Sequence, residues 1–247
     1  MTIKSVLNYS PNFDPIKRGK KEIKFIIFHY TGMKRESDAI SRLTEIQSEV
    51  SSHYLVKNNG EIISLVPDLY AAWHAGKSTW KSYSSLNKNS IGIEISNPGH
   101  EFIYKKFSKK QIDSLLRLSK SLIKKYKIKS QNILGHSDIA PTRKKDPGEK
   151  FPWKYLAKNK IGLWHNVKSL VLKSNRGYKT SSVDKKNFFK NLLKLGYSKK
   201  NSKNFNKNKL QLLITKAFQR RYRQELITGK IDKECSIISQ NLIKKIS

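Results

Sequence analysis

The chain has 247 residues, of which 37% are hydrophobic and 10% aromatic, and this composition supports a folded core and excludes a wholly disordered chain. Lysine and arginine number 51 against 18 acidic residues, and the net charge of +33 favours polyanionic partners: nucleic acid, anionic membrane surfaces or an acidic wall polymer. A biased genome rich in Lys, Asn, Ile and Ser codons explains the charge equally well. Cys235 is the only cysteine, which excludes an intrachain disulfide and a Cys-rich metal site.

The opening segment, residues 1–22, reads as an irregular arm and has no apolar run of signal-peptide length. No run elsewhere in the sequence approaches the length of a membrane span. We therefore expect no transmembrane segment and a chain that stays in the cytoplasm as written. Action in the periplasm or at the cell wall by another export route is left open.

Short apolar runs predict strands in the first half of the chain. Residues 22–30, "EIKFIIFHY", form a β-branched and aromatic run that ends at His29. A helix is expected over 37–47, and two strands over 52–67 are joined by a tight turn at Asn58-Asn59-Gly60. Residues 90–99, "SIGIEISNPG", read as a further buried strand closed by Asn97-Pro98-Gly99.

The clearest helix spans residues 107–128. Ser108 and Gln111 form a capping box, and six apolar residues make the stripe that faces the core: Ile112, Leu115, Leu116, Leu118, Leu122 and Ile123. The short strand "NILG", residues 132–135, follows it. This order predicts an α/β fold in which a mixed central β-sheet is flanked by helices.

The character of the sequence changes near residue 173. We predict a domain over 1–172, a polar linker over 173–182 and a small three-helix domain over 183–247. Gly196 and Gly229 lie where helix C-caps are expected.

Three residues at element ends are candidate metal ligands: His29, His136 and Asp146. Two imidazoles and a carboxylate suit Zn²⁺ with a fourth position open to water, whose pKa would fall to about 7. Spacing alone is weak support, because a histidine at a strand end is often structural and Asp before Pro-Gly is often a turn former.

Five motifs that occur in this order strengthen the case for a metal site: "FIIFHYTG", "SSHYLVKNNGEIISLV", "AAWHAGKSTW", "NSIGIEISNPG" and "GHSDIAPTRKKDPG". Together, over residues 8–164, they resemble the zinc-dependent N-acetylmuramoyl-L-alanine amidases of the amidase-2 family (AmpD/AmiD-type), which is related to the peptidoglycan-recognition proteins. The resemblance implies the amidase-2 fold. It also implies an activity, hydrolysis of the amide between the muramoyl lactyl group and L-Ala of peptidoglycan or (anhydro)muropeptides. It also implies one catalytic Zn²⁺ held by His29, His136 and Asp146.

The same resemblance implies roles for residues around the metal. Glu94 matches the general base that takes a proton from the zinc-activated water, and Lys144 matches the residue that stabilises the oxyanion. Arg143 is a candidate for binding a substrate carboxylate. His74 and Trp73 are candidates for substrate contact, with Trp73 equally suited to the core, and Asn97 either binds the stem peptide or forms its turn.

The C-terminal helices weakly resemble a small three-helix peptidoglycan-binding domain. Two alternatives to the amidase are kept: a non-catalytic peptidoglycan receptor on the same fold, and a nucleic-acid-binding protein. The intact set of candidate metal ligands argues against the receptor. Basic residues are spread along the chain without a recognised nucleic-acid motif, which argues against the nucleic-acid-binding protein, so no specific nucleic acid is expected.

Overall fold

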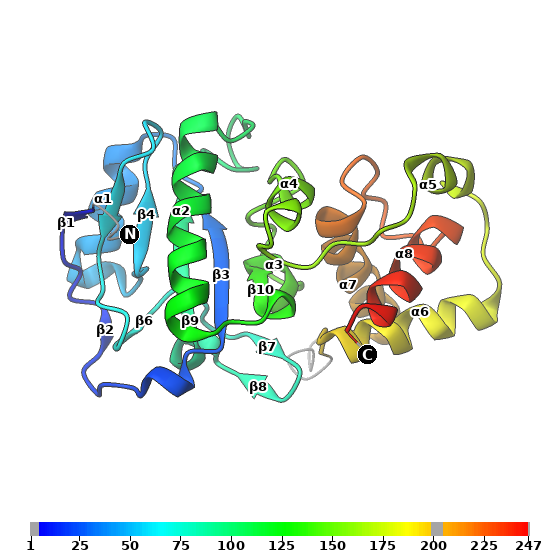
Figure 1. Ribbon diagram of the computed structural model, residues 1–247, viewed down its shortest axis with the longest axis horizontal. Helices are drawn as coiled ribbons and strands as arrows, with labels where there is room; N and C mark the ends of the chain where they lie inside the picture. The colour runs from blue at the N-terminus through cyan, green and yellow to red at the C-terminus, as the bar shows by residue number, and fades with distance from the viewer. Residues whose placement is uncertain (1–4, 199–204, 247) are drawn as a thin grey trace.

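A computed structural model describes residues 5–198 and 205–246. Its centre is a six-stranded sheet in the order β1-β5-β4-β9-β3-β10 (Figure 1). The strands are β1 (Val6–Leu7), β3 (Phe25–Tyr30), β4 (Tyr54–Val56), β5 (Ile62–Ser64), β9 (Ser90–Ile95) and β10 (Ile133–Gly135). Within these six described strands the β4–β5 pair is antiparallel and the other four pairs are parallel, so the sheet is mixed, as predicted.

Alternation along β9 sends its side chains to two different environments. Ile91, Ile93 and Ile95 pack into the core beneath α2 (Lys109–Tyr126), which lies across the sheet in Figure 1. Ser90 and Glu94 alternate with them and therefore project from the opposite face. The predicted capping box of α2 is present, and its predicted stripe packs against this core.

The opposite face is covered in part by α1 (Glu36–Thr44). Leu43 of α1 packs with Leu55 and Ile63 of the hairpin, whose turn has Gly60 at φ +86°. The opening arm is more ordered than predicted, because it contributes the edge strand β1 and also β2 (Phe13–Asp14), which pairs with β6 (Ala71–Ala72). A second ribbon joins β7 (Thr79–Trp80) and β8 (Tyr83–Ser84). Short 3₁₀ turns cover Lys20–Glu22, Ile46–Ser48, Leu86–Asn89 and Ser130–Asn132.

Short helices lead from the sheet to the C-terminal region. They are α3 (His136–Ile139), α4 (Trp153–Lys158) and α5 (Ser169–Asn175), followed by α6 (Ser182–Leu195), α7 (Lys207–Tyr222) and α8 (Lys233–Lys244). The last three match the predicted helices and begin at side-chain caps. The predicted linker begins inside α5, which the sequence did not indicate.

One predicted cap is wrong. Gly196 ends α6 with φ +135°, as expected, but α7 ends at Tyr222 and Gly229 lies in the following turn. The helix ends early because Arg223, 1% exposed, leaves the helical conformation and its guanidinium pairs with Asp232.

The C-terminal helices share a hydrophobic core with the sheet. Phe25 and Ile27 of β3 belong to the same buried cluster as Phe188 of α6 and Phe218 of α7. In Figure 1 these helices lie beyond β10, at the end of the molecule opposite β1. The two regions are therefore joined by apolar packing as well as by the chain.

A buried polar network strengthens this junction. Arg221 of α7 donates to Asp138 of α3 at 2.5 Å and to the Ile133 carbonyl at 2.8 Å, and its guanidinium lies 4.3 Å from the ring centroid of Trp153. The Tyr197 hydroxyl donates to Asp138 at 2.7 Å, and both Arg221 and Asp138 are almost fully buried. Among the described residues, no helix is long and apolar enough to cross a membrane.

Candidate metal centre and active site

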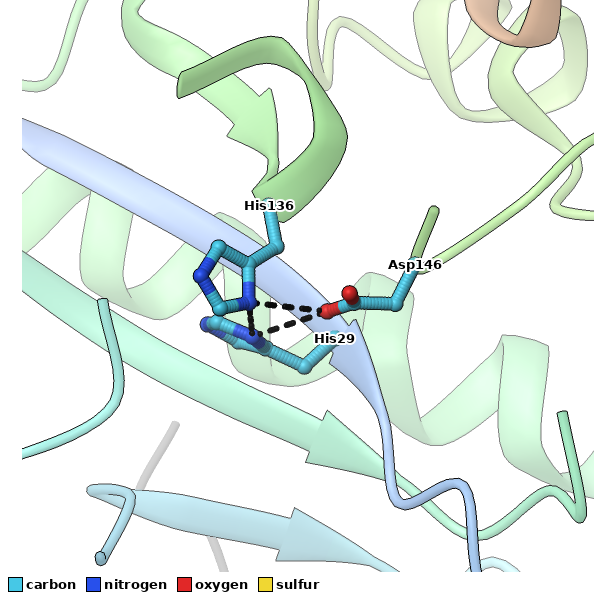
Figure 2. A group of neighbouring side chains, drawn as sticks. All are labelled: His29, His136 and Asp146. Carbon is cyan, nitrogen blue, oxygen red and sulfur yellow. Dashed lines mark hydrogen bonds and ion pairs between the residues drawn. The ribbon is translucent and has the colours of Figure 1, made fainter. Parts of the chain in front are cut away.

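Three side chains from different elements converge at one end of the parallel strands (Figure 2). His29 is near the end of β3, His136 is the first residue of α3 directly after β10, and Asp146 lies in the loop that follows. The Nδ1 atoms of the two histidines are 2.9 Å apart, and each is 3.1 Å from Oδ2 of Asp146. The structure therefore brings together the three residues that the sequence suggested as ligands.

The chemistry of this cluster fits a divalent metal ion. All three residues are buried, and their ligand atoms lie within 4.8 Å of one another. A tetrahedral ion with bonds of about 2.0–2.1 Å needs ligand atoms roughly 3.3 Å apart, close to the separations found here. The N, N, O donor set is one that zinc accepts while leaving a position free.

The protonation states also suit metal binding. Burial, with a smaller contribution from His136, lowers the pKa of His29 to about 4, and burial lowers the pKa of His136 as well. Burial alone would raise the pKa of Asp146, but the two histidines outweigh it and hold that pKa well below its usual value. Near neutral pH the cluster thus presents two neutral imidazoles and a carboxylate, the forms that ligate metals.

Glu94 lies beside the cluster because of strand register. It is the direct partner of His29 in the β3–β9 pairing, and its Oε1 is 3.9 Å from His29 Nδ1. Its Oε2 is buried without a hydrogen-bond partner in the described chain. Burial and, secondarily, the charge of Asp146 raise the pKa of Glu94 to about 8, while Lys144 opposes this shift. A buried carboxyl with a pKa near neutrality is suited to accept and return protons.

The cluster forms the floor of a cleft of about 350 Å³. Glu94, Trp73 and His74 line it together with four basic side chains: Arg42, Arg143, Lys144 and Lys145. The cleft can therefore accept a ligand that carries negative charge and bring it to the candidate metal position.

The residues predicted to contact substrate already form contacts within the protein. Trp73 lines the cleft while its indole donates to Asp14 at 2.8 Å, and His74 is 8% exposed and contacts His29. Arg143 lines the cleft but donates to the backbone carbonyls of Ala75 and Lys77.

Asn97 contacts Thr31 and Gly32, which line the cleft, but does not line it itself. Its amide nitrogen donates to the Lys105 carbonyl at 2.9 Å, and its oxygen accepts from the Gly99 amide at 3.1 Å. This geometry favours the turn-forming interpretation of Asn97 over a contact with substrate.

Sequence reasoning missed Arg42, on the exposed side of α1, and Ser90, the first residue of β9. Arg42 has no motif around it, and only the packing of α1 beside the cleft reveals it. Ser90 was read as part of a buried strand; its role depends on a contact with His74 that no local pattern encodes.

Comparison with known proteins identifies the family that this fold and cluster define. A family model described as N-acetylmuramoyl-L-alanine amidase, Amidase_2, matches residues 19–149. The chain belongs to the amidase-2 family. The predicted fold class, a mixed sheet flanked by helices with a helical C-terminal region, is confirmed by its structural neighbours.

Two relatives and two solved structures illustrate the similarity. The chain is 36% identical over 235 residues to the N-acetylmuramoyl-L-alanine amidase AmiD of Escherichia coli, covering 90% of this chain and 83% of AmiD. It is 31% identical over 167 residues to the 1,6-anhydro-N-acetylmuramyl-L-alanine amidase AmpD of Haemophilus influenzae, covering 60% of this chain and 88% of AmpD.

Among solved structures, AmiD from E. coli in complex with the substrate anhydro-N-acetylmuramic acid-L-Ala-D-gamma-Glu-L-Lys gives a TM-score of 0.78 at 34% identity. That match covers 94% of this chain and 92% of the other. AmpDH3 from Pseudomonas aeruginosa, in complex with anhydromuramic pentapeptide, gives a TM-score of 0.78 at 29% identity, with 94% of each chain covered.

Proposed function

We propose that this protein is a zinc-dependent N-acetylmuramoyl-L-alanine amidase that separates the stem peptide from the muramoyl group of muropeptides. The observation that carries the proposal is the buried His29–His136–Asp146 cluster with Glu94 beside it at the base of a cationic cleft. Relatives that align along most of the chain are amidases by name, and two solved neighbours hold anhydromuramyl peptides. These relatives give no support to the non-catalytic receptor alternative.

His29, His136 and Asp146 would hold the zinc. A zinc ion held there would supply Lewis-acid polarisation of water and of the scissile carbonyl. Glu94 would take the proton from the attacking water and return it to the departing L-alanine nitrogen, because its carboxyl lies beside the cluster and its Oε2 has no hydrogen-bond partner in the described part of the chain. Lys144, half-buried in the cleft, would balance the negative charge that develops on the carbonyl oxygen.

The remaining cleft side chains would bind the stem peptide. Arg143 has donors anchored to the backbone, which holds its positive charge in place at the cleft wall. Arg42 is exposed and forms no ion pair with the residues that the structure describes, so it can turn towards a peptide carboxylate. Trp73 and His74 would contact the sugar or the first residues of the peptide, as the resemblance implies.

The C-terminal helices, residues 183–247, are proposed to bind peptidoglycan, with 1–172 as the catalytic domain and 173–182 as the connection. A second cleft, of about 1020 Å³, supports this assignment. Phe189 and Leu212 contribute apolar lining, and lysines surround it: Lys179, Lys185, Lys186, Lys190, Lys207 and Lys230. Co-sedimentation with insoluble murein, compared between the wild type and Lys186→Glu/Lys190→Glu, tests it; equal binding would count against the assignment.

The activity itself is tested with a defined anhydro-muramoyl tripeptide. We expect mass spectrometry to detect free tripeptide beginning with L-alanine, to lose that product on chelation and to recover it with added zinc. Glu94→Gln should bind zinc and release product about 10²–10⁴-fold more slowly than the wild type. Failure to cleave this substrate and intact murein, with zinc bound, would contradict the proposed function.

A further inference from the structure

A chain of buried hydrogen bonds extends from the metal cluster into the sheet. His29 Nε2, the nitrogen that faces away from the cluster, lies 3.0 Å from Nδ1 of His74. His74 Nε2 lies 3.0 Å from Oγ of Ser90, and that oxygen lies 2.6 Å from the carbonyl oxygen of Leu86. The exposed fractions of these residues are 8% or less, so water does not compete for the contacts.

The direction of every bond in this chain follows from its last member. The Leu86 carbonyl can only accept, and two oxygens 2.6 Å apart require a hydrogen between them, so Ser90 donates its single proton there. Ser90 must then accept from His74, which places that proton on Nε2 and leaves a lone pair on Nδ1. The lone pair on His74 Nδ1 accepts from His29, so the proton of His29 is on Nε2.

This assignment leaves the Nδ1 lone pair of His29 directed at the metal cluster. The opposite tautomer would point an N–H at the ligand atoms of His136 and Asp146, 2.9 and 3.1 Å away, and would block metal binding. Ser90 and His74 therefore select the binding form of His29 without contacting the metal position themselves.

The second histidine ligand contacts the neighbouring residue of the same segment. His136 Nε2 lies 3.2 Å from the carbonyl oxygen of Ala75, which only accepts, and 3.2 Å from a guanidinium nitrogen of Arg143, which only donates, so these contacts do not select one tautomer of His136. The amide of Ala75 in turn donates to Oδ1 of Asn87 at 2.7 Å, which holds the segment in place. Two consecutive residues, His74 and Ala75, thus supply the outer partners of both imidazoles.

The sheet contains a specific space for the His74 ring. A Cβ at Gly92 of β9 would lie 2.4 Å from Cγ of His74, so only glycine allows the ring to lie against the strand. The packing of β9 therefore sets the position of His74 as firmly as its hydrogen bonds do.

We propose that His74 and Ser90 are positioning residues that hold His29 in its metal-ligating tautomer. The inference rests on the proposed zinc site and adds the residues that orient it. Outer partners of histidine ligands typically change metal affinity by about 10–100-fold. Because these residues act on the zinc-free site, their effect on metal affinity can be measured without following substrate turnover.

The tautomers can be read directly in the zinc-free wild-type protein. Two-bond ¹⁵N–¹H correlation spectra of the imidazoles, at a pH where the rings are neutral, should show Nε2–H for His29 and His74. An Nδ1–H form of His29 or His74 as the main species would overturn the inference. This measurement needs no variant and so does not depend on whether a substitution folds.

Variants then test the consequence for zinc affinity, measured by competition with a chromophoric chelator. Ser90→Ala should weaken binding by about 10–100-fold, because His74 loses the acceptor that sets its tautomer. Ser119→Ala is the matched control: Ser119 is equally buried, its hydroxyl has no hydrogen-bond partner among the described residues, and zinc affinity should not change. His74→Asn, which keeps an acceptor near the Nδ1 position, should retain more affinity than His74→Leu.

Unfolding of each zinc-free variant separates loss of the fold from loss of the site. Weakened zinc binding in Ser90→Ala at a stability matching Ser119→Ala supports the inference, and equal zinc affinity in the two variants refutes it. If the wild type binds no zinc at all, the proposed function fails as well. If it binds zinc and cleaves substrate while Ser90→Ala matches the wild type, only this inference fails.

Discussion

Replacing Arg221 by methionine removes one partner of a buried ion pair and leaves the other in place. Without the guanidinium, the partners that the Asp138 carboxylate, 1% exposed, would keep among the described residues are the Tyr197 hydroxyl at 2.7 Å and the Gly135 amide at 2.8 Å. Met fills a similar length of apolar space but cannot satisfy the charge. The Ile133 carbonyl would also lose its donor.

The expected cost is large on the scale of protein stability. Breaking a buried ion pair by removing one partner destabilises by about 3–5 kcal/mol, and a typical free energy of unfolding is about 5–15 kcal/mol. Arg117→Met is the matched control, because Arg117 is exposed on α2 and such changes stay within about 0.5 kcal/mol.

Urea unfolding of the zinc-free protein, followed by circular dichroism and tryptophan fluorescence, measures both values. We expect one transition for the wild type, since the helices and the sheet share a core. Arg221→Met/Asp138→Asn should recover part of the loss, because the uncompensated charge is gone. A loss below about 1 kcal/mol for Arg221→Met would contradict the 3–5 kcal/mol expected for a broken buried pair.

Three further outcomes are expected. Glu94→Gln should lower kcat by roughly 10²–10⁴-fold with zinc content unchanged; lost zinc would point to a ligand role instead. Burial alone would raise the pKa of Asp68, but hydrogen bonds from a lysine and two tyrosines outweigh it and lower that pKa. The stabilisation of the folded state by the Asp68 carboxylate is therefore complete above the pKa of about 4 that this group has in the unfolded chain. It is lost as the pH falls through the lower pKa of the folded state. As the pH is lowered, the free energy of unfolding should fall less steeply in Asp68→Asn than in the wild type. Equal slopes of this free energy against pH in the two proteins would count against the prediction. Gly196→Ala should lower Tm more than Gly177→Ala: both glycines have positive φ, but a Cβ at Gly196 would lie 2.3 Å from Trp80 and one at Gly177 meets nothing within 4 Å. Equal changes in Tm for the two variants would mean that the Trp80 side chain moves aside at no cost in stability.

The sequence predicted β3, β4, β5, β9 and β10 because their signals are local, and the resemblance carried by five ordered motifs implied the ligand cluster. β3 and β9 are apolar runs with a functional residue near the end, and the loop of His136 and Asp146 carries its own motif. The link from His74 to Ser90 could not be predicted, because it joins residues 16 positions apart through tertiary packing.

Two other features were beyond local patterns for a physical reason. α5 has seven residues, and Leu170 is 79% exposed, so the helix leaves no apolar periodicity to detect. α7 ends early because Arg223 pairs with Asp232 across a turn, a contact that helix propensity does not contain.

Strand β9 carries the sheet's structural and chemical tasks on alternating residues. Its isoleucines support α2, while Ser90, Gly92 and Glu94 serve the cluster from the other face. A single residue inserted at the start of this strand would reverse every side chain after it, exposing isoleucine to the cleft and forcing Glu94 beneath α2. The lineage of this protein can therefore change β9 by substitution but not by odd-numbered insertion or deletion, so its length is constrained as tightly as its residues.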